Sequence, residues 1–139
     1  YLNKISGPLL DRIDIHIEVV PVAVDSITGM QASEPSCIIR ERVVRARKVQ
    51  ADRFRKLDNI HCNAQMSSGM SHEFCMLDSE CTAILKNAMD LLGLSARAYD
   101  RILKVSRTIA DLEQSNDIKA AHLSEAIGYR NLDREGWAG

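Results

Sequence analysis

Apolar residues recur at intervals of three and four along most of this chain, and no other feature constrains the fold as strongly. Residues at that spacing share one face of an α-helix, so each sustained run predicts a helix that buries this face. Four runs are present, and they cover residues 36–57, 78–92, 95–113 and 119–128. Because the last three are joined by short links, the pattern predicts a compact helical bundle.

Polar residues and glycine mark where these helices begin and end. Ser95 is a good N-cap for the third helix, and Gly93 is placed to stop the second one. The inward face of the first helix is Ile39, Val43, Ala46, Gln50, Phe54 and Leu57, and that of the third is Ala98, Ile102, Val105, Ile109 and Leu112. Residues 58–75 show little periodicity, so we expect a long loop there with a short turn of helix.

The first part of the chain has a different pattern. Gly7 and Pro8 predict a turn. After it, apolar and polar residues alternate, with Ile13, Ile15, Ile17 and Val19 on one side and Asp14, His16 and Glu18 on the other. This alternation predicts a half-buried strand over residues 13–20. A lone strand is not stable in water, so its sheet must lie outside this sequence. The expected fold is therefore mainly α, with four helices preceded by one orphan β-strand segment.

Composition and charge narrow the class of protein. A chain of 139 residues with 45% apolar and 27% charged residues is typical of one soluble globular domain. Its formal net charge of −1 argues against a polycation that binds nucleic acid through overall charge. It has no apolar run of membrane-spanning length and no signal-peptide pattern, so we expect a cytoplasmic protein with no membrane partner. Tyr1 in place of an initial Met suggests a piece of a longer protein.

The four cysteines are Cys37, Cys62, Cys75 and Cys81. They are too few and too irregularly spaced for a secreted disulfide scaffold, so we expect reduced thiols. Together with His61 and His72, three of them, Cys62, Cys75 and Cys81, could be assembled into a zinc site. The alternative is that they are buried free cysteines, which are common. We expect the second, and hence no metal.

Three segments resemble one family. Residues 8–14, PLLDRID, resemble the P-L-L-[DS]-R-[FI]-D segment of the AAA+ clade that holds magnesium chelatase ATPase subunits, ComM-type competence proteins and MCM helicases. Residues 94–103, LSARAYDRIL, resemble the sensor-2 helix of the ComM type, and residues 121–130, AHLSEAIGYR, close the match. The chain thus resembles the C-terminal part of a ComM-like, magnesium chelatase-related ATPase of the YifB family.

The resemblance implies a division of the chain. Residues 1–24 would be the terminal piece of a AAA+ α/β nucleotide-binding core, and residues 25–36 a linker loop. Residues 37–130 would form a helical lid domain, followed by a tail over residues 131–139.

Arg12 is the first candidate site residue. The resemblance implies that it is an arginine finger, which reaches from one subunit into the nucleotide site of the next. A planar, permanently charged guanidinium suits the charge that spreads over the γ-phosphate during phosphoryl transfer. The alternative from the residues alone is a salt bridge within the chain to Asp11 or Asp14.

Arg97 is the second candidate, and the residues themselves support it. It lies two residues past the Ser95 N-cap, where the helix dipole is positive and a cation is disfavoured unless an anion joins it. By resemblance Arg97 is sensor 2, which contacts the γ-phosphate. A surface arginine with a long reach is the alternative. Arg101, one turn further on, is the second choice for the nucleotide-binding residue.

The helix over residues 36–57 is rich in basic residues, with only Glu41 and Asp52 as acidic ones. Its basic residues are Arg40, Arg42, Arg45, Arg47, Lys48, Arg53, Arg55 and Lys56. Such a surface is either a solvated face or a contact for a DNA or RNA backbone.

The resemblance implies a full-length enzyme that hydrolyses ATP with Mg²⁺ in a ring of identical subunits, a hexamer, and works on DNA. A magnesium chelatase ATPase subunit is the first alternative, and a stand-alone helical nucleic-acid-binding adaptor is the second. No G-x-x-x-x-G-K-[ST] loop and no acidic Walker-B strand end are present. We therefore expect this chain alone to bind no ATP or Mg²⁺ and to have no ATPase activity.

Overall fold

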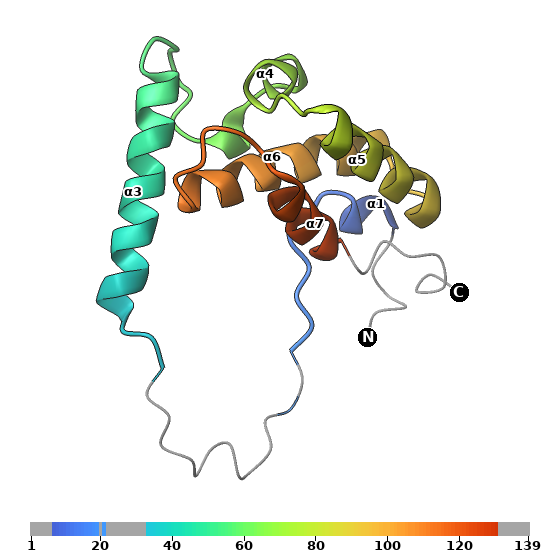
Figure 1. Ribbon diagram of the computed structural model, residues 1–139, viewed down its shortest axis with the longest axis horizontal. Coiled ribbons are helices and arrows are strands. Elements are labelled where there is room, and N and C mark those ends of the chain that lie inside the picture. The colour runs from blue at the N-terminus through green and yellow to red at the C-terminus, as the bar shows by residue number, and fades with distance from the viewer. Residues whose placement is uncertain (1–6, 20, 22–32, 131–139) are drawn as a thin grey trace.

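The computed structural model describes residues 7–19, 21 and 33–130, and in these ranges the chain is helical (Figure 1). The α-helices are α1 (Gly7–Leu10), α3 (Ser36–Phe54), α4 (Ser68–Phe74), α5 (Ser79–Leu92), α6 (Ala96–Leu112) and α7 (Ala120–Gly128), and η2 (Asn63–Gln65) is a 3₁₀ helix. The expected mainly helical fold is confirmed. Within the described ranges, no helix combines the length and the apolar character needed to cross a membrane.

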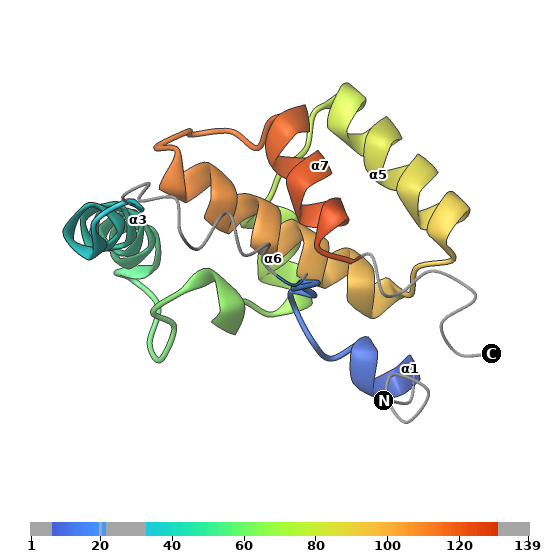
Figure 2. The same cartoon turned by 90° about the horizontal axis from the view of Figure 1, so that it is seen from below.

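Helix α6 is the centre of the fold. It contacts α3, α4, η2 and α7, and α7 lies between α6 and α5 (Figure 2). Ala98, Ile102 and Ile109 of α6 are buried, as the spacing predicts. Val105 is only half-buried and Leu112 is 37% exposed, because α7 covers a narrower part of α6 than the pattern predicts. The rest of the core is contributed by α3, α5, α7 and the loops between them.

The predicted helix ends are confirmed at three positions. The Ser95 side chain accepts a hydrogen bond from the Ala98 N–H at the start of α6. Asp78 caps α5 in the same way, by accepting from the N–H of Cys81 at 2.7 Å. Gly93 ends α5 with φ of 60°, a left-handed conformation that glycine adopts without a Cβ clash. These caps fix both ends of α5 and the start of α6.

Helix α3 is packed only in its second half. Ala46, Gln50 and Phe54 are buried, whereas Ile39 and Val43 are each 43% exposed. Figure 1 shows the reason, since the N-terminal half of α3 extends away from the other helices. The predicted inward face is therefore wrong for Ile39 and Val43, and also for Leu57, which lies beyond the helix end and is 40% exposed.

The segment predicted as a long loop, residues 58–75, contains more structure than one turn. Both η2 and α4 lie within it. The Ser67 side chain caps α4 by accepting from the Met70 N–H, and Met66 and Cys75 are buried in the core. Helix α4 has only seven residues, too few for the spacing of Met70 and Phe74 to form a sustained helical run in the sequence.

The predicted strand over residues 13–20 does not form among the described residues, and residue 20 lies outside them. Ile13, Ile15, Ile17 and Val19 are 40 to 87% exposed, whereas His16 is 5% exposed. A strand needs a neighbouring strand for its backbone hydrogen bonds, and the described part of the chain offers none. The segment instead runs along α6 and α7. The greater part of the predicted linker and the whole predicted tail lie outside the described residues.

Candidate functional site

Arg12 lies in the turn that follows α1. The N–H groups of Arg12 and Ile13 donate to the carbonyls of Leu9 and Leu10, both at 3.0 Å, and this closes the turn. The Arg12 side chain is exposed, and among the described residues it makes no ion pair. The alternative of an internal salt bridge to Asp11 or Asp14 is therefore not what the structure shows.

The two aspartates beside Arg12 have other partners. Asp14 forms an ion pair with Arg101 of α6, and the Asp11 carboxylate lies 3.9 Å from Nη2 of Arg130. The backbone is held as well, since Arg101 Nε donates to the Asp11 carbonyl at 3.0 Å and Arg130 Nη1 donates to the Ile13 carbonyl. The chain on both sides of Arg12 is thus attached to the helices while the Arg12 guanidinium faces solvent.

Arg97 lies in the first turn of α6, directly after the Ser95 cap. Its side chain is exposed and makes no ion pair among the described residues. The unpaired N–H groups of a helix N-terminus and the helix dipole favour an anion at this end of α6. No described contact joins Arg97 to Arg12. Arg101 differs from both, because its guanidinium already has Asp14 and the Asp11 carbonyl as partners.

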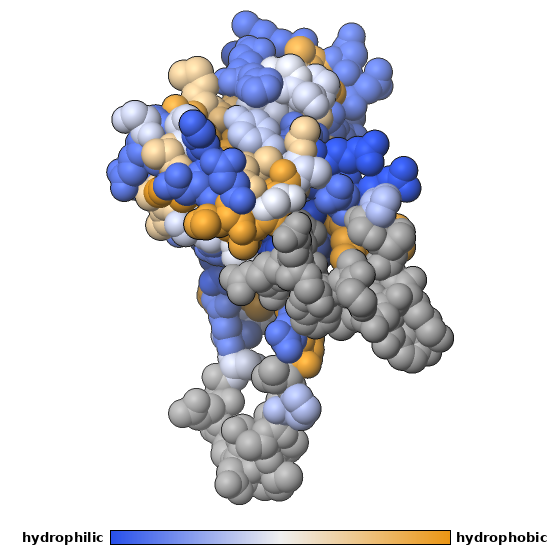
Figure 3. Space-filling view, turned by 90° about the vertical axis from the view of Figure 1, so that its right-hand side faces the viewer, coloured by the Kyte–Doolittle hydropathy of each residue, from blue (hydrophilic) through white to orange (hydrophobic). Residues whose placement is uncertain are grey.

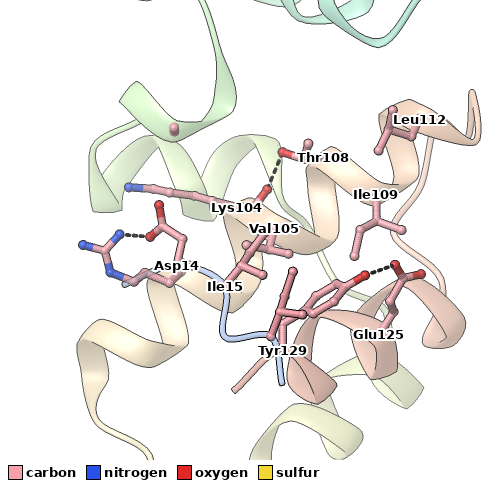
Figure 4. Close-up of a pocket in the computed structure, with 12 residues that line it drawn as sticks. Asp14, Ile15, Lys104, Val105, Thr108, Ile109, Leu112, Glu125 and Tyr129 are labelled. Carbon is pink, nitrogen blue, oxygen red and sulfur yellow. Dashed lines mark hydrogen bonds and ion pairs between the residues drawn. The ribbon is translucent and has the colours of Figure 1, made fainter. Parts of the chain in front are cut away.

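A groove of about 340 Å³ lies between residues 14–17 and the helices α6 and α7 (Figure 4). Its walls are mainly apolar and include Ile15, Ile17, Val105, Ile109 and Leu112. At one side the Tyr129 hydroxyl donates to Glu125 at 2.9 Å, and this hydrogen bond raises the pKa of Tyr129. Apolar patches also lie between hydrophilic residues on the face drawn in Figure 3. Two cations, Arg101 and Lys104, also line the groove, but each already forms an ion pair, with Asp14 and with Asp100.

Comparison with known proteins identifies the family. The model for the C-terminal part of the magnesium chelatase subunit ChlI matches residues 33–130, which is most of the chain. This chain belongs to the ChlI family. A second ChlI model matches residues 1–27, so Arg12 lies in one matched region and Arg97 in the other.

Sequence identity to individual proteins supports the assignment of this chain to the ChlI family. The chain is 44% identical over 136 residues to the competence protein ComM of Haemophilus influenzae, and 43% identical over 136 residues to the uncharacterized protein YifB of Escherichia coli. An uncharacterized protein of Mycobacterium bovis is 30% identical over 130 residues. These alignments cover 94 to 96% of this chain but only 25 to 26% of each relative. The chain thus spans about a quarter of the length of the relatives it matches.

This ChlI-family chain contains a buried polar network that the sequence pattern did not predict. Asp111 is completely buried and accepts hydrogen bonds from Arg53 at 2.5 and 2.8 Å, from Arg107 at 3.1 Å and from the Asn63 side-chain amide at 2.8 Å. Gln50 of α3 accepts from the Asn63 backbone N–H at 3.1 Å. The network therefore joins α3 and η2 to the C-terminal end of α6. The sequence did contain one sign of this network, because Arg107 and Asp111 are four residues apart and such residues are neighbours on a helix.

The four cysteines of this ChlI-family chain lie in different elements or loops of the structure. Cys75 and Cys81 are buried, and burial raises the pKa of each thiol to about 11. Cys37 is exposed and Cys62 is partly exposed. Among the described residues, no group of three or more His, Cys, Asp or Glu side chains is arranged to hold a metal ion.

Proposed function

We propose that this chain is the C-terminal part of a ring-forming AAA+ ATPase that couples ATP hydrolysis to remodelling of DNA. It would contribute the end of the nucleotide-binding core and the helical lid. The observation that carries the proposal is the state of two arginines, Arg12 and Arg97. Each is exposed and makes no ion pair among the described residues, although the segments that hold them are firmly attached. The likeness to a competence protein supports DNA as the substrate.

Arg12 would act on the nucleotide of a neighbouring subunit. ATP bound with Mg²⁺ supplies the phosphoryl group, and the transition state spreads negative charge over the γ-phosphate oxygens. The Arg12 guanidinium is planar, always charged and free to reach outward, so it can stabilise this charge with two hydrogen bonds. The described residues hold no acidic cluster for Mg²⁺. The metal and most of the phosphate contacts would therefore lie in the rest of the full-length protein.

Arg97 would act on the nucleotide of its own subunit. Its place in the first turn of α6 costs a few tenths of a kcal/mol because the helix dipole repels a cation there. A bound γ-phosphate removes this cost, since the dipole and the guanidinium then attract the same anion. Arg97 would thereby connect the position of the lid to the presence of ATP.

The proposal requires an assembly of identical subunits. An arginine that acts on the next subunit implies a head-to-tail interface, and repeated head-to-tail interfaces form a ring when the rotation between neighbouring subunits closes. We propose a hexamer that works in the cytoplasm with ATP and Mg²⁺.

Substitution of the two arginines in the full-length protein tests this function. Arg12→Ala should lower ATP turnover by about a thousandfold or more while ATP still binds, because the residue acts only on the transition state. Arg97→Ala should weaken both ATP binding and turnover. Lys86→Ala, which removes an exposed cation from α5, is the control and should change neither. Turnover retained in the Arg12 variant would remove the finger assignment.

The family match also favours a second candidate, the ATPase subunit of a magnesium chelatase, which would drive Mg²⁺ into a porphyrin. Full-length protein mixed with the remaining chelatase subunits, porphyrin, Mg²⁺ and ATP should then form the metalloporphyrin, whereas the proposed DNA function predicts ATP turnover that rises when DNA is added.

The basic surface of α3 favours a third candidate, a nucleic-acid-binding adaptor. Such an adaptor should shift DNA in a gel as the isolated chain, with an affinity that falls steeply as salt rises. The lid assignment predicts little binding until the ring assembles.

A further inference from the structure

Arg101 connects the turn that carries Arg12 to the helix that carries Arg97. We propose that Arg101 is a positioning residue, which holds Arg12 in the orientation needed to reach the neighbouring subunit. This inference rests on the proposed function, and it assigns to Arg101 a role other than contact with the nucleotide.

The contacts lie on both sides of Arg12. Before it, the Asp11 carbonyl accepts from Arg101 Nε at 3.0 Å. After it, the Ile13 carbonyl accepts from Arg130 Nη1, and Asp14 forms its ion pair with Arg101, which is the dashed line beside Asp14 in Figure 4. The backbone on either side of Arg12 is therefore held in place, and the freedom that remains is rotation about its side-chain bonds.

Arginine is suited to this position for a geometric reason. Arg101 uses Nε for the Asp11 carbonyl and Nη1 for the Asp14 carboxylate, so two edges of one rigid plane contact two points of the same turn. A lysine has one nitrogen and cannot hold both points at a fixed separation. These contacts engage Nε and Nη1 of Arg101, so a phosphate at these two nitrogens would compete with the turn that carries Arg12.

Arg101 attaches the turn that carries Arg12 to α6, the helix that also carries Arg97. Arg97 and Arg101 are four residues apart, hence one turn apart on one rigid helix. Movement of α6 that follows ATP binding at Arg97 must also move the turn that carries Arg12. Through Arg101, the binding of ATP in one subunit would therefore change the position of Arg12 in the active site of the next subunit.

Mixed rings of the full-length protein test this inference. Subunits with Arg12→Ala keep a working nucleotide site, and subunits with Arg97→Ala keep a working finger. Neither should hydrolyse ATP alone, and a mixture should recover turnover at the interfaces where the intact finger meets the intact site. Arg101→Gln is then added to one type of subunit at a time, and the turnover of each mixture is measured.

A positioning role predicts an asymmetric result. Arg101→Gln in the subunit that supplies the finger should lower the recovered turnover by roughly tenfold to a hundredfold, as expected for a misplaced catalytic group. The same change in the subunit that lacks the finger should have no effect. Lys104→Gln, which removes the ion pair to Asp100 one turn away on α6, should have no effect in either subunit.

The other outcomes contradict the inference in distinguishable ways. If turnover falls only when Arg101→Gln lies in the subunit that carries Arg12→Ala, Arg101 contacts the nucleotide. Equal loss in both would show a general structural role, and no loss in either would show that the contacts do not matter for turnover. If the Arg12→Ala and Arg97→Ala subunits do not recover turnover when mixed, the proposed function itself fails, and this inference with it.

Discussion

Asp111 of α6 connects this helix to α3 through its contacts with Arg53. It is fully buried, and it forms ion pairs with both the buried Arg107 and the partly buried Arg53. Asp111→Ala should therefore lower the free energy of unfolding by about 3–5 kcal/mol, because it leaves guanidinium groups without a counter-charge inside the protein. Urea denaturation of the 139-residue chain measures this change.

The matched control is Asp100→Ala. Asp100 pairs with Lys104 at 2.8 Å within α6, but this pair is partly exposed. Its loss should cost only about 0.3–0.5 kcal/mol, as for other pairs on a helix surface. Equal losses for the two variants would show that the Asp111 network does not hold α3.

At this scale the sequence reveals some residues and hides others. Arg12 and Arg97 were predicted from local signals, a family motif and a helix cap, and their roles at a nucleotide stay predictions. The partners of Arg101 could not be predicted in this way, since Asp11 and Asp14 lie about ninety positions away along the chain. Asp111 was hidden for the same reason, as it joins segments that only tertiary packing brings together.

Among the elements, α5 has the clearest dependence on pH. Its cap, Asp78, accepts from the Cys81 N–H, and this hydrogen bond holds the pKa of Asp78 below its ordinary value of 3.8. A carboxyl whose pKa is lowered by folding stabilises the protein above its ordinary pKa. That stabilisation is lost as the pH falls through the lower, folded value.

Asp78→Asn tests this dependence, because asparagine caps a helix about as well but does not titrate. The unmodified chain should lose more stability than the variant when the pH is lowered from neutral to below 3.8. Urea denaturation over that range gives both curves. Parallel curves would mean that the cap does not contribute to the loss of stability in acid.

The elements also show why sequence patterns succeed or fail. Helices α5, α6 and α7 were predicted well because their caps and spacing are local properties of the chain. The strand over residues 13–20 was not, because its stability depends on a partner strand. The outward half of α3 was misassigned because the spacing predicts which face is apolar, not whether anything covers it.

For the whole molecule, we expect the isolated 139-residue chain to hydrolyse no ATP. In the proposed function it contributes two arginines toward a nucleotide, but its sequence has no phosphate-binding loop. A phosphate-release assay on the purified chain checks this, with the full-length protein as the positive control. Turnover by the chain that is lost in its Arg97→Ala variant would require a complete active site within these residues.

The shape of the molecule has a mechanical consequence at α3. This helix is held at one end by the Asp111 network and by Phe54, while the part before Ala46 extends for about 15 Å without support from the described helices (Figure 1). A rotation of about 20° at the held end would move the far tip by about 5 Å. A small change in the orientation of α3 around its contacts with α6 would thus be largest at the N-terminal tip of the helix, where its exposed side chains are.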